Sequence, residues 1–152
     1  MADQSLITVL SAALTPVIAV GAAYIAYQNM NTAKHKIKID LFEKRLKVYN
    51  NLKDLTSRLY TNLFPEEDPY LDFVDVLKEA QWLYDKATIE WIDNHIGVNI
   101  RDMVIKNDEV EMAEGEDKLR ARKEMRALRS SLVAAEHEMR DVFSPFLKIH
   151  EQ

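Results

Sequence analysis

The chain has 152 residues, the length of one ordinary domain, and its 25 acidic and 20 basic side chains give a formal charge of -5. Without cysteine it can form neither a disulfide framework nor a thiolate metal site, and it has no cysteine nucleophile. Three glycines leave almost nothing from which to build glycine-rich phosphate loops, and a hydrophobic content of 47% argues against wholesale disorder. The charges are unevenly spread, since residues 4 to 33 carry none.

Residues 5 to 27 form an apolar run that predicts a transmembrane helix. At about 1.5 Å per residue they extend roughly 34 Å, enough to cross a bilayer core of about 30 Å. A signal peptide is disfavoured because the leader is acidic and the run is too long, although cleavage near residues 21 to 23 stays open. A buried soluble helix rarely continues this far without a charge. We predict a membrane anchor over residues 1 to 32 and a helical domain over residues 33 to 152.

Basic residues follow the predicted span, and those nearest to it are Lys34, Lys36 and Lys38. By the positive-inside rule they place the C-terminal domain in the cytoplasm, which predicts a single-pass protein of the bacterial inner membrane. The same lysines are expected to lie against anionic lipid headgroups, so that the bilayer itself is a partner.

Small residues recur at every fourth position of the span, at Ser11, Thr15, Ala19 and Ala23. Such a ridge lets helices approach closely in lipid, so it predicts self-association of the span. The alternative is that alanine is simply common in membrane spans. Pro16 lies beside the ridge and is expected to kink the helix or to free a carbonyl group.

Beyond the span, scarce glycine and proline predict an all-α helical bundle. The periodicity predicts one helix over residues 33 to 64, continuing from the span, and a second from Tyr70 to about His95. Residues 96 to 112 predict a short helix with Gly97 at a junction. The stretch NDEVEMAEGED, residues 107 to 117, predicts an acidic connector or a frayed helix end.

The last helix carries an a/d heptad seam and is expected to kink or end at Ser144-Pro145. The members of the seam are Ala121, Met125, Leu128, Leu132, Ala135, Met139, Val142 and Phe146. This pattern predicts either the core of a bundle or a coiled coil between subunits, and we expect the protein to form a homo-oligomer through it.

Patterns for catalysis or metal binding are missing. The Glu-x-x-His spacing of di-iron bundles fails, since Ile92 stands three residues before His95 and Ala134 three before His137. No P-loop, serine elbow or H-E-x-x-H motif occurs. His137 and Asp141 offer only two ligands on a charged helix. We therefore predict a non-enzymatic protein with no catalytic residue, metal or cofactor.

Cations on the last helix predict an anion-binding surface. Lys118, Arg122, Arg126 and Arg129, the basic stripe, fall within an arc of about 80° at 100° per residue. Guanidinium groups suit phosphate recognition, which predicts a ligand such as a cyclic oligonucleotide or another phosphorylated molecule. The alternative is that the stripe pairs with the acids between residues 108 and 117 or with Glu136. Double-stranded nucleic acid is disfavoured because the chain is acidic and the stripe is short.

Residues 38 to 55, KIDLFEKRLKVYNNLKDL, resemble a recurring type of small bacterial protein with one N-terminal span, a basic-aromatic helix and a cytosolic helical domain. Some such proteins belong to phage-defence or CRISPR-associated systems, where membrane effectors respond to cyclic oligoadenylates by perturbing the inner membrane. The resemblance implies a non-enzymatic effector of antiviral defence. Two other hypotheses stay open: an inner-membrane adaptor that docks a protein partner, and a holin-type pore former, which the large cytosolic domain disfavours.

Overall fold

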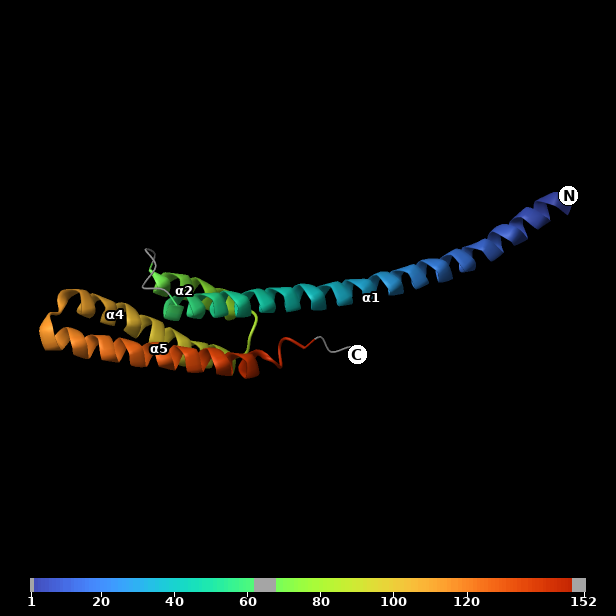
Figure 1. Cartoon of the computed structure of the whole chain (residues 1–152). Coiled ribbons are helices and arrows are strands. Elements are labelled where there is room, and N and C mark those ends of the chain that lie inside the picture. Colours follow the sequence, from blue (N-terminus) through green and yellow to red (C-terminus); the bar gives the residue numbers. More distant parts are fainter. Residues whose placement is uncertain (1, 62–67, 149–152) are drawn as a thin grey trace. The chain divides into compact units, whose positions relative to one another are not determined.

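The structure is a computed structural model of the chain, and it describes residues 2 to 61 and 68 to 148. Side chains in the first of these segments are described from residue 16 onward. Every regular element in these segments is a helix, which confirms the predicted all-α fold (Figure 1). Contacts divide the chain into two units, residues 1 to 40 and residues 41 to 152.

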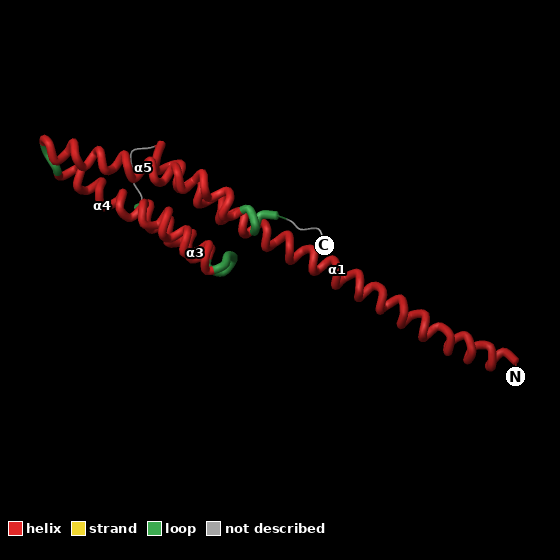
Figure 2. The backbone as a smooth tube through the Cα atoms, turned by 90° about the horizontal axis from the view of Figure 1, so that it is seen from below, coloured by secondary structure: helices red, strands yellow, loops and turns green. Residues whose placement is uncertain are grey.

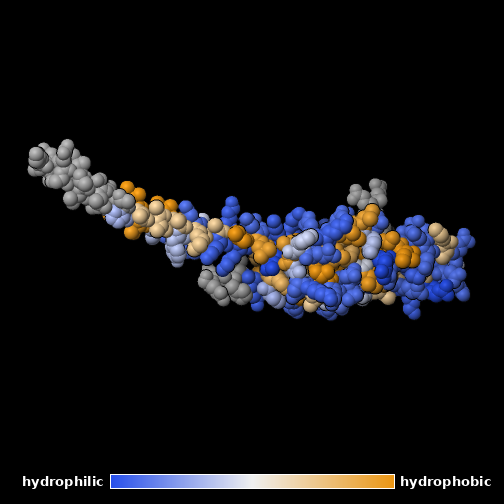
Figure 3. Space-filling view, turned by 180° about the vertical axis from the view of Figure 1, so that it is seen from behind, coloured by the Kyte–Doolittle hydropathy of each residue, from blue (hydrophilic) through white to orange (hydrophobic). Residues whose placement is uncertain are grey.

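Helix α1 (Ala2–Thr61) runs without interruption through the predicted boundary at residue 32, and Pro16 lies inside it. In the first unit its large apolar side chains are exposed; Val17, for example, is 69% exposed and Tyr27 is 57% exposed. Figure 3 shows apolar atoms on the surface of the segment that adjoins the undescribed N-terminal side chains. The lysines at positions 34, 36 and 38 are also exposed.

Among the residues that the structure describes, no helix is long and apolar enough to cross a bilayer. The predicted span begins in residues 5 to 15, whose side chains lie outside the described part. The same holds for Ser11 and Thr15 of the small-residue ridge, whereas Ala19 and Ala23 are described and exposed.

The second unit is a bundle of antiparallel helices. It contains the end of α1, then α2 (Pro69–Ala80), α3 (Lys86–Ile92), the π-helical turn η1 (Asp93–Gly97), α4 (Val98–Met112) and α5 (Gly115–Phe143). Figure 2 shows α3 and α4 following one another in one line, because η1 joins them without a loop. Helices α4 and α5 lie side by side along their lengths.

The core of the bundle draws on every one of these helices. Fully buried large side chains include Leu52 and Leu59 of α1, Phe73 of α2, Met103 of α4 and Phe143 at the end of α5. The apolar residues at helical spacing between Val48 and Leu59 form the face that α1 buries.

The heptad seam of α5 belongs to this same core. Ala121, Met125, Leu132, Ala135 and Met139 are buried within one chain, and the remaining members are partly buried. The sequence allowed two roles for the seam, and in the structure it forms part of the bundle core. An oligomer that pairs subunits through this seam has no support, because the chain's own helices already cover it. The predicted end of the helix at residues 144 and 145 is confirmed.

The prediction of a single helix from Tyr70 to His95 is wrong. Helix α2 ends at Ala80, and α3 begins only after Asp85. Asp85 caps the new helix, because its carboxylate accepts a hydrogen bond of 2.9 Å from the backbone N–H of Thr88. The Thr88 side chain and this N–H also lower the pKa of Asp85. Tyr84 lies in this short break, and its side chain is buried in the core, where it is 8% exposed.

The predicted acidic connector is also shorter than expected. Its first six residues, 107 to 112, extend α4, and only Ala113 and Glu114 separate α4 from α5. Gly115 then adopts a φ of 59°, a backbone conformation in which a side chain would be strained.

Gly97 lies at the predicted helix junction, and the structure supplies the reason. A Cβ atom at this position would lie 2.6 Å from Cε1 of Phe73, whose ring is 1% exposed and has no room to retreat. Glycine therefore lets α2 approach the junction of α3 and α4 closely.

We expect Gly97→Ala to destabilise the bundle by about 1–3 kcal/mol, because the added methyl group overpacks the ring of Phe73. Urea denaturation followed by circular dichroism measures the change in the free energy of unfolding. Gly21→Ala is the matched control, since a Cβ there meets nothing within 4 Å. A double variant with Phe73→Leu should lose less stability than the sum of the two single changes; strict additivity would contradict the proposed clash.

Candidate anion-binding site

The basic stripe lies on one outer face of α5. Arg122 and Arg126 are exposed, and Lys118 and Arg129 are half-buried. From position 118 to position 129 the helix rises about 16 Å, so the four cations present a row rather than a single point of charge. The stripe lies about a quarter turn from the buried seam, as the spacing predicted.

None of the four cations forms an ion pair with a carboxylate among the described residues. The alternative of pairing with the acids at 108 to 117 is therefore absent from the described contacts. Arg120, which lies outside the stripe, instead forms an ion pair with Asp117, at 3.0 Å. In Arg129, Nε is buried and has no hydrogen-bond partner in the described part of the chain. The exposed arginines of the stripe, Arg122 and Arg126, are thus available to an external anion.

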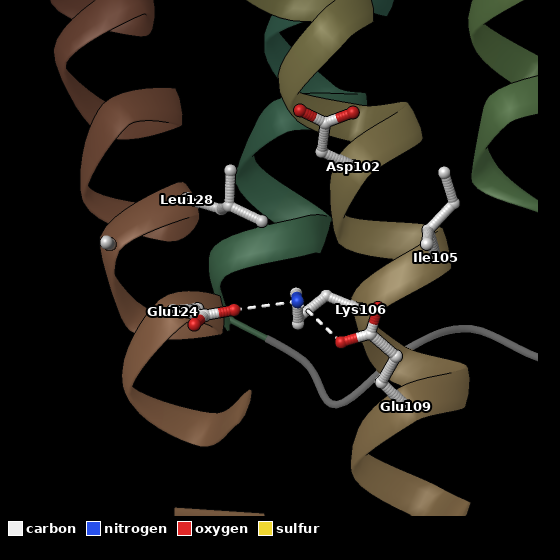
Figure 4. A pocket seen from close by; sticks show the side chains of 7 residues that line it. Asp102, Ile105, Lys106, Glu109, Glu124 and Leu128 are labelled. Atoms are coloured by element: carbon white, nitrogen blue, oxygen red, sulfur yellow. Dashed lines mark hydrogen bonds and ion pairs between the residues drawn. The ribbon is translucent and has the colours of Figure 1, made fainter. Parts of the chain in front are cut away.

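A second surface feature, which the sequence did not single out, lies on the other side of α5. Between α4 and α5 an open groove of about 440 Å³ is lined by Asp102, Ile105, Lys106, Glu109, Glu124 and Leu128; we call it the α4–α5 groove (Figure 4). A neighbouring hollow of about 470 Å³ extends it past Met112 toward Asp117 and Arg120.

Lys106 crosses the α4–α5 groove and holds the two helices together. Its Nζ lies 2.7 Å from a carboxylate oxygen of Glu124 on α5 and also contacts Glu109 one turn along α4. The hydrogen bonds to Glu109 and Glu124 raise the pKa of Lys106, and the hydrogen bond from Lys106 lowers the pKa of Glu124. The single lysine is therefore fully engaged by the groove's own acids. No spacing rule identifies this arrangement, because its members come from two helices.

A third cluster connects α1, the break after α2 and the end of α5. The Tyr84 hydroxyl donates a 2.7 Å hydrogen bond to the carbonyl of Arg45, and Nε of Arg45 donates one of 2.9 Å to the carbonyl of Leu83. The ring of Tyr84 packs edge-on against Phe143 and Phe146, at 4.9 and 5.2 Å between centroids. The guanidinium of Arg45 lies 5.3 Å from the Phe146 ring centroid. Burial raises the pKa of Tyr84, an effect that the charge of Arg45 partly opposes.

Tyr84 makes the stability of the bundle sensitive to alkaline pH. A tyrosine whose pKa is raised by folding stays neutral in the folded chain while the unfolded chain ionises above about pH 10, so its contribution to stability is lost as the pH rises. At pH 8 we expect Tyr84→Phe to cost about 1 kcal/mol through the lost hydrogen bond. Urea denaturation should show this difference shrinking between pH 8 and pH 11. A constant difference would contradict the burial of the neutral hydroxyl, and Tyr24→Phe, at an exposed tyrosine, is the control.

Comparisons with known proteins gave no match for this chain. Family models, curated proteins and solved structures were each searched, and none matched. The resemblance of residues 38 to 55 to small single-span bacterial effectors therefore stays a prediction.

Proposed function

We propose that this protein is a non-enzymatic, membrane-anchored effector whose helical domain binds an anionic ligand through the basic stripe of α5. The observation that carries the proposal is that the stripe has no carboxylate partner among the described residues. Acids outnumber bases in this chain by 25 to 20, so unpaired arginines are not explained by a shortage of carboxylates.

The chemistry of the stripe favours a phosphorylated ligand. Arginine presents a planar fork of donors that matches two phosphate oxygens, and the rise between neighbouring members of the row, about 4 to 6 Å, suits successive phosphates. A cyclic oligonucleotide has this chemistry, in keeping with the resemblance to defence effectors. A ligand changes the state of such a protein only if it binds one arrangement of the subunits more tightly than another.

The first unit supports attachment to a membrane. Between residues 17 and 30 the exposed apolar side chains point to all sides of α1, which needs an apolar surrounding on every side. The exposed lysines at 34, 36 and 38 follow directly and suit anionic headgroups. In this proposal residues 5 to 27 cross the bacterial inner membrane, the bundle lies in the cytoplasm, and the small-residue ridge associates spans.

A second candidate function is that of an adaptor that docks a protein partner. The observation that favours it is the α4–α5 groove, an open hollow whose lining includes Ile105, which is 52% exposed. An adaptor of this kind needs no small ligand, so an assembly that is insensitive to phosphorylated ligands distinguishes it.

Ligand binding is tested with the double variant Arg122→Ala/Arg126→Ala of the full chain in lipid nanodiscs. We expect cyclic oligoadenylates or inorganic pyrophosphate to bind the wild type, and the double variant to bind at least about tenfold more weakly, because charge-assisted hydrogen bonds contribute about 1.5–3 kcal/mol each. Isothermal titration calorimetry measures the affinity. Arg120→Ala is the matched control, since Arg120 is already paired with Asp117 on the same helix. Equal binding by the double variant would exclude the stripe as the site.

Membrane attachment is tested by washing membranes with alkaline carbonate and blotting for the full chain. We expect the wild type to stay in the pellet, and Val17→Lys/Val20→Lys to be largely released, because each lysine at the centre of a span costs about 2.5–3.5 kcal/mol. Ile37→Lys is the control, because Ile37 is similarly exposed but lies beyond the predicted span. Release of the wild type would contradict the anchor.

A further inference from the structure

We infer that the α4–α5 groove of one copy receives the basic stripe of a second copy, so that the chains assemble side by side in the membrane. The inference rests on the proposed function in two respects: the membrane anchor confines the copies to one surface, and the phosphorylated ligand and the neighbour's carboxylates would compete for the same arginines.

The groove has the chemistry to accept a basic helix. Three acids, Asp102, Glu109 and Glu124, line it against one lysine, and that lysine is already engaged by two of them (Figure 4). Beyond them, Asp117 lies in the adjoining hollow and pairs with Arg120. Over both hollows the four carboxylates pair with three cations, Lys106, Arg120 and Arg101, which leaves an excess of one negative charge around an apolar floor. This surface is complementary to a row of arginines with apolar stems.

The stripe and the groove lie on nearly opposite sides of the same helix. At 100° per residue, the centre of the stripe and the centre of Glu124, Ala127 and Leu128 are about 160° apart around α5. Each copy therefore has a basic side and an acidic side. Such a contact is heterologous, since it joins different surfaces, and it continues from copy to copy, either into a closed ring or into an open row.

Apolar contacts add to the charges. Leu119 is 67% exposed and lies within about 20° of Arg126 around α5, at the edge of the stripe. Ile105 is 52% exposed at the floor of the groove. A stable soluble interface buries about 1,200–2,000 Å². Confinement to one membrane raises the effective concentration of the copies, so that a smaller contact area is enough for assembly.

Competition between the ligand and the neighbouring copy for the same arginines would let the ligand regulate assembly. A phosphorylated ligand that occupies Arg122 and Arg126 withdraws them from the neighbour's acids, so ligand binding and assembly oppose each other. Linkage makes this effect reciprocal: assembly weakens ligand binding by the same factor by which the ligand weakens assembly.

The test uses cysteine cross-linking of the full chain in cell membranes, which is direct because the chain contains no cysteine. Two differently tagged copies are co-expressed, one with Ile105→Cys and one with Leu119→Cys, and treated with a short bismaleimide. We expect a cross-link between the two tags. Lys53→Cys is exposed and lies outside both surfaces, so it should cross-link to neither. Cross-links only between two copies of Ile105→Cys would show a symmetric contact and overturn the inference.

Charge reversal then identifies the surfaces. Arg122→Glu/Arg126→Glu in the Leu119→Cys copy should reduce the cross-link at least about fivefold. Asp102→Lys/Glu109→Lys in the Ile105→Cys copy should restore it, because the attraction returns with the signs exchanged. Circular dichroism of each purified variant checks that it is folded. Failure of the exchanged pair to recover, with both variants folded, would overturn the inference.

A final comparison separates this inference from the proposed function. The variant Asp102→Lys/Glu109→Lys keeps the whole basic stripe, so by itself it should lose assembly and still bind pyrophosphate at least as tightly as the wild type. A cross-link between the Ile105→Cys and Leu119→Cys copies, with no binding of phosphorylated ligands by the wild type, would overturn the ligand and leave the assembly. Ligand binding without a cross-link would overturn the assembly alone.

Discussion

The hydrogen-bonded contact between Arg45 and Tyr84 joins the separate segments of the bundle. Arg45 lies on α1, Tyr84 lies in the break after α2, and the tyrosine ring meets Phe143 and Phe146 at the end of α5. Three segments far apart in the sequence therefore share one buried hydrogen bond and one aromatic cluster. Burying the neutral hydroxyl is favourable only with this partner, which makes the contact specific as well as stabilising.

The same cluster joins α1 to the helix that carries the basic stripe. Arg45 follows the end of the first unit by five residues, and Phe143 ends α5. Tyr84 contacts both of these residues.

Charge is divided among surfaces in a way that the net value of -5 conceals. The α4–α5 groove uses its only lysine internally, and the stripe on the far side of α5 has no described partner. Basic and acidic residues that could have neutralised each other within one chain are instead held apart by the helix that carries them. Charges of one sign that are gathered on one surface repel each other. Such surfaces are therefore expected where they meet external partners.

Periodicity and proline act locally, so they are enough to predict the helical class, the buried face of α1, the seam of α5 and the end of α5 at Ser144-Pro145. The sequence also indicated Gly97 as a junction. It missed the break at Gln81–Asp85, since the helical period continues across it and only the cap at Asp85 marks it. Whether the seam faced its own chain or another, and which acids met Lys106, only the tertiary structure decided. Both depend on which helices become neighbours, and neither the spacing of apolar residues nor the order of charges along one helix contains that information.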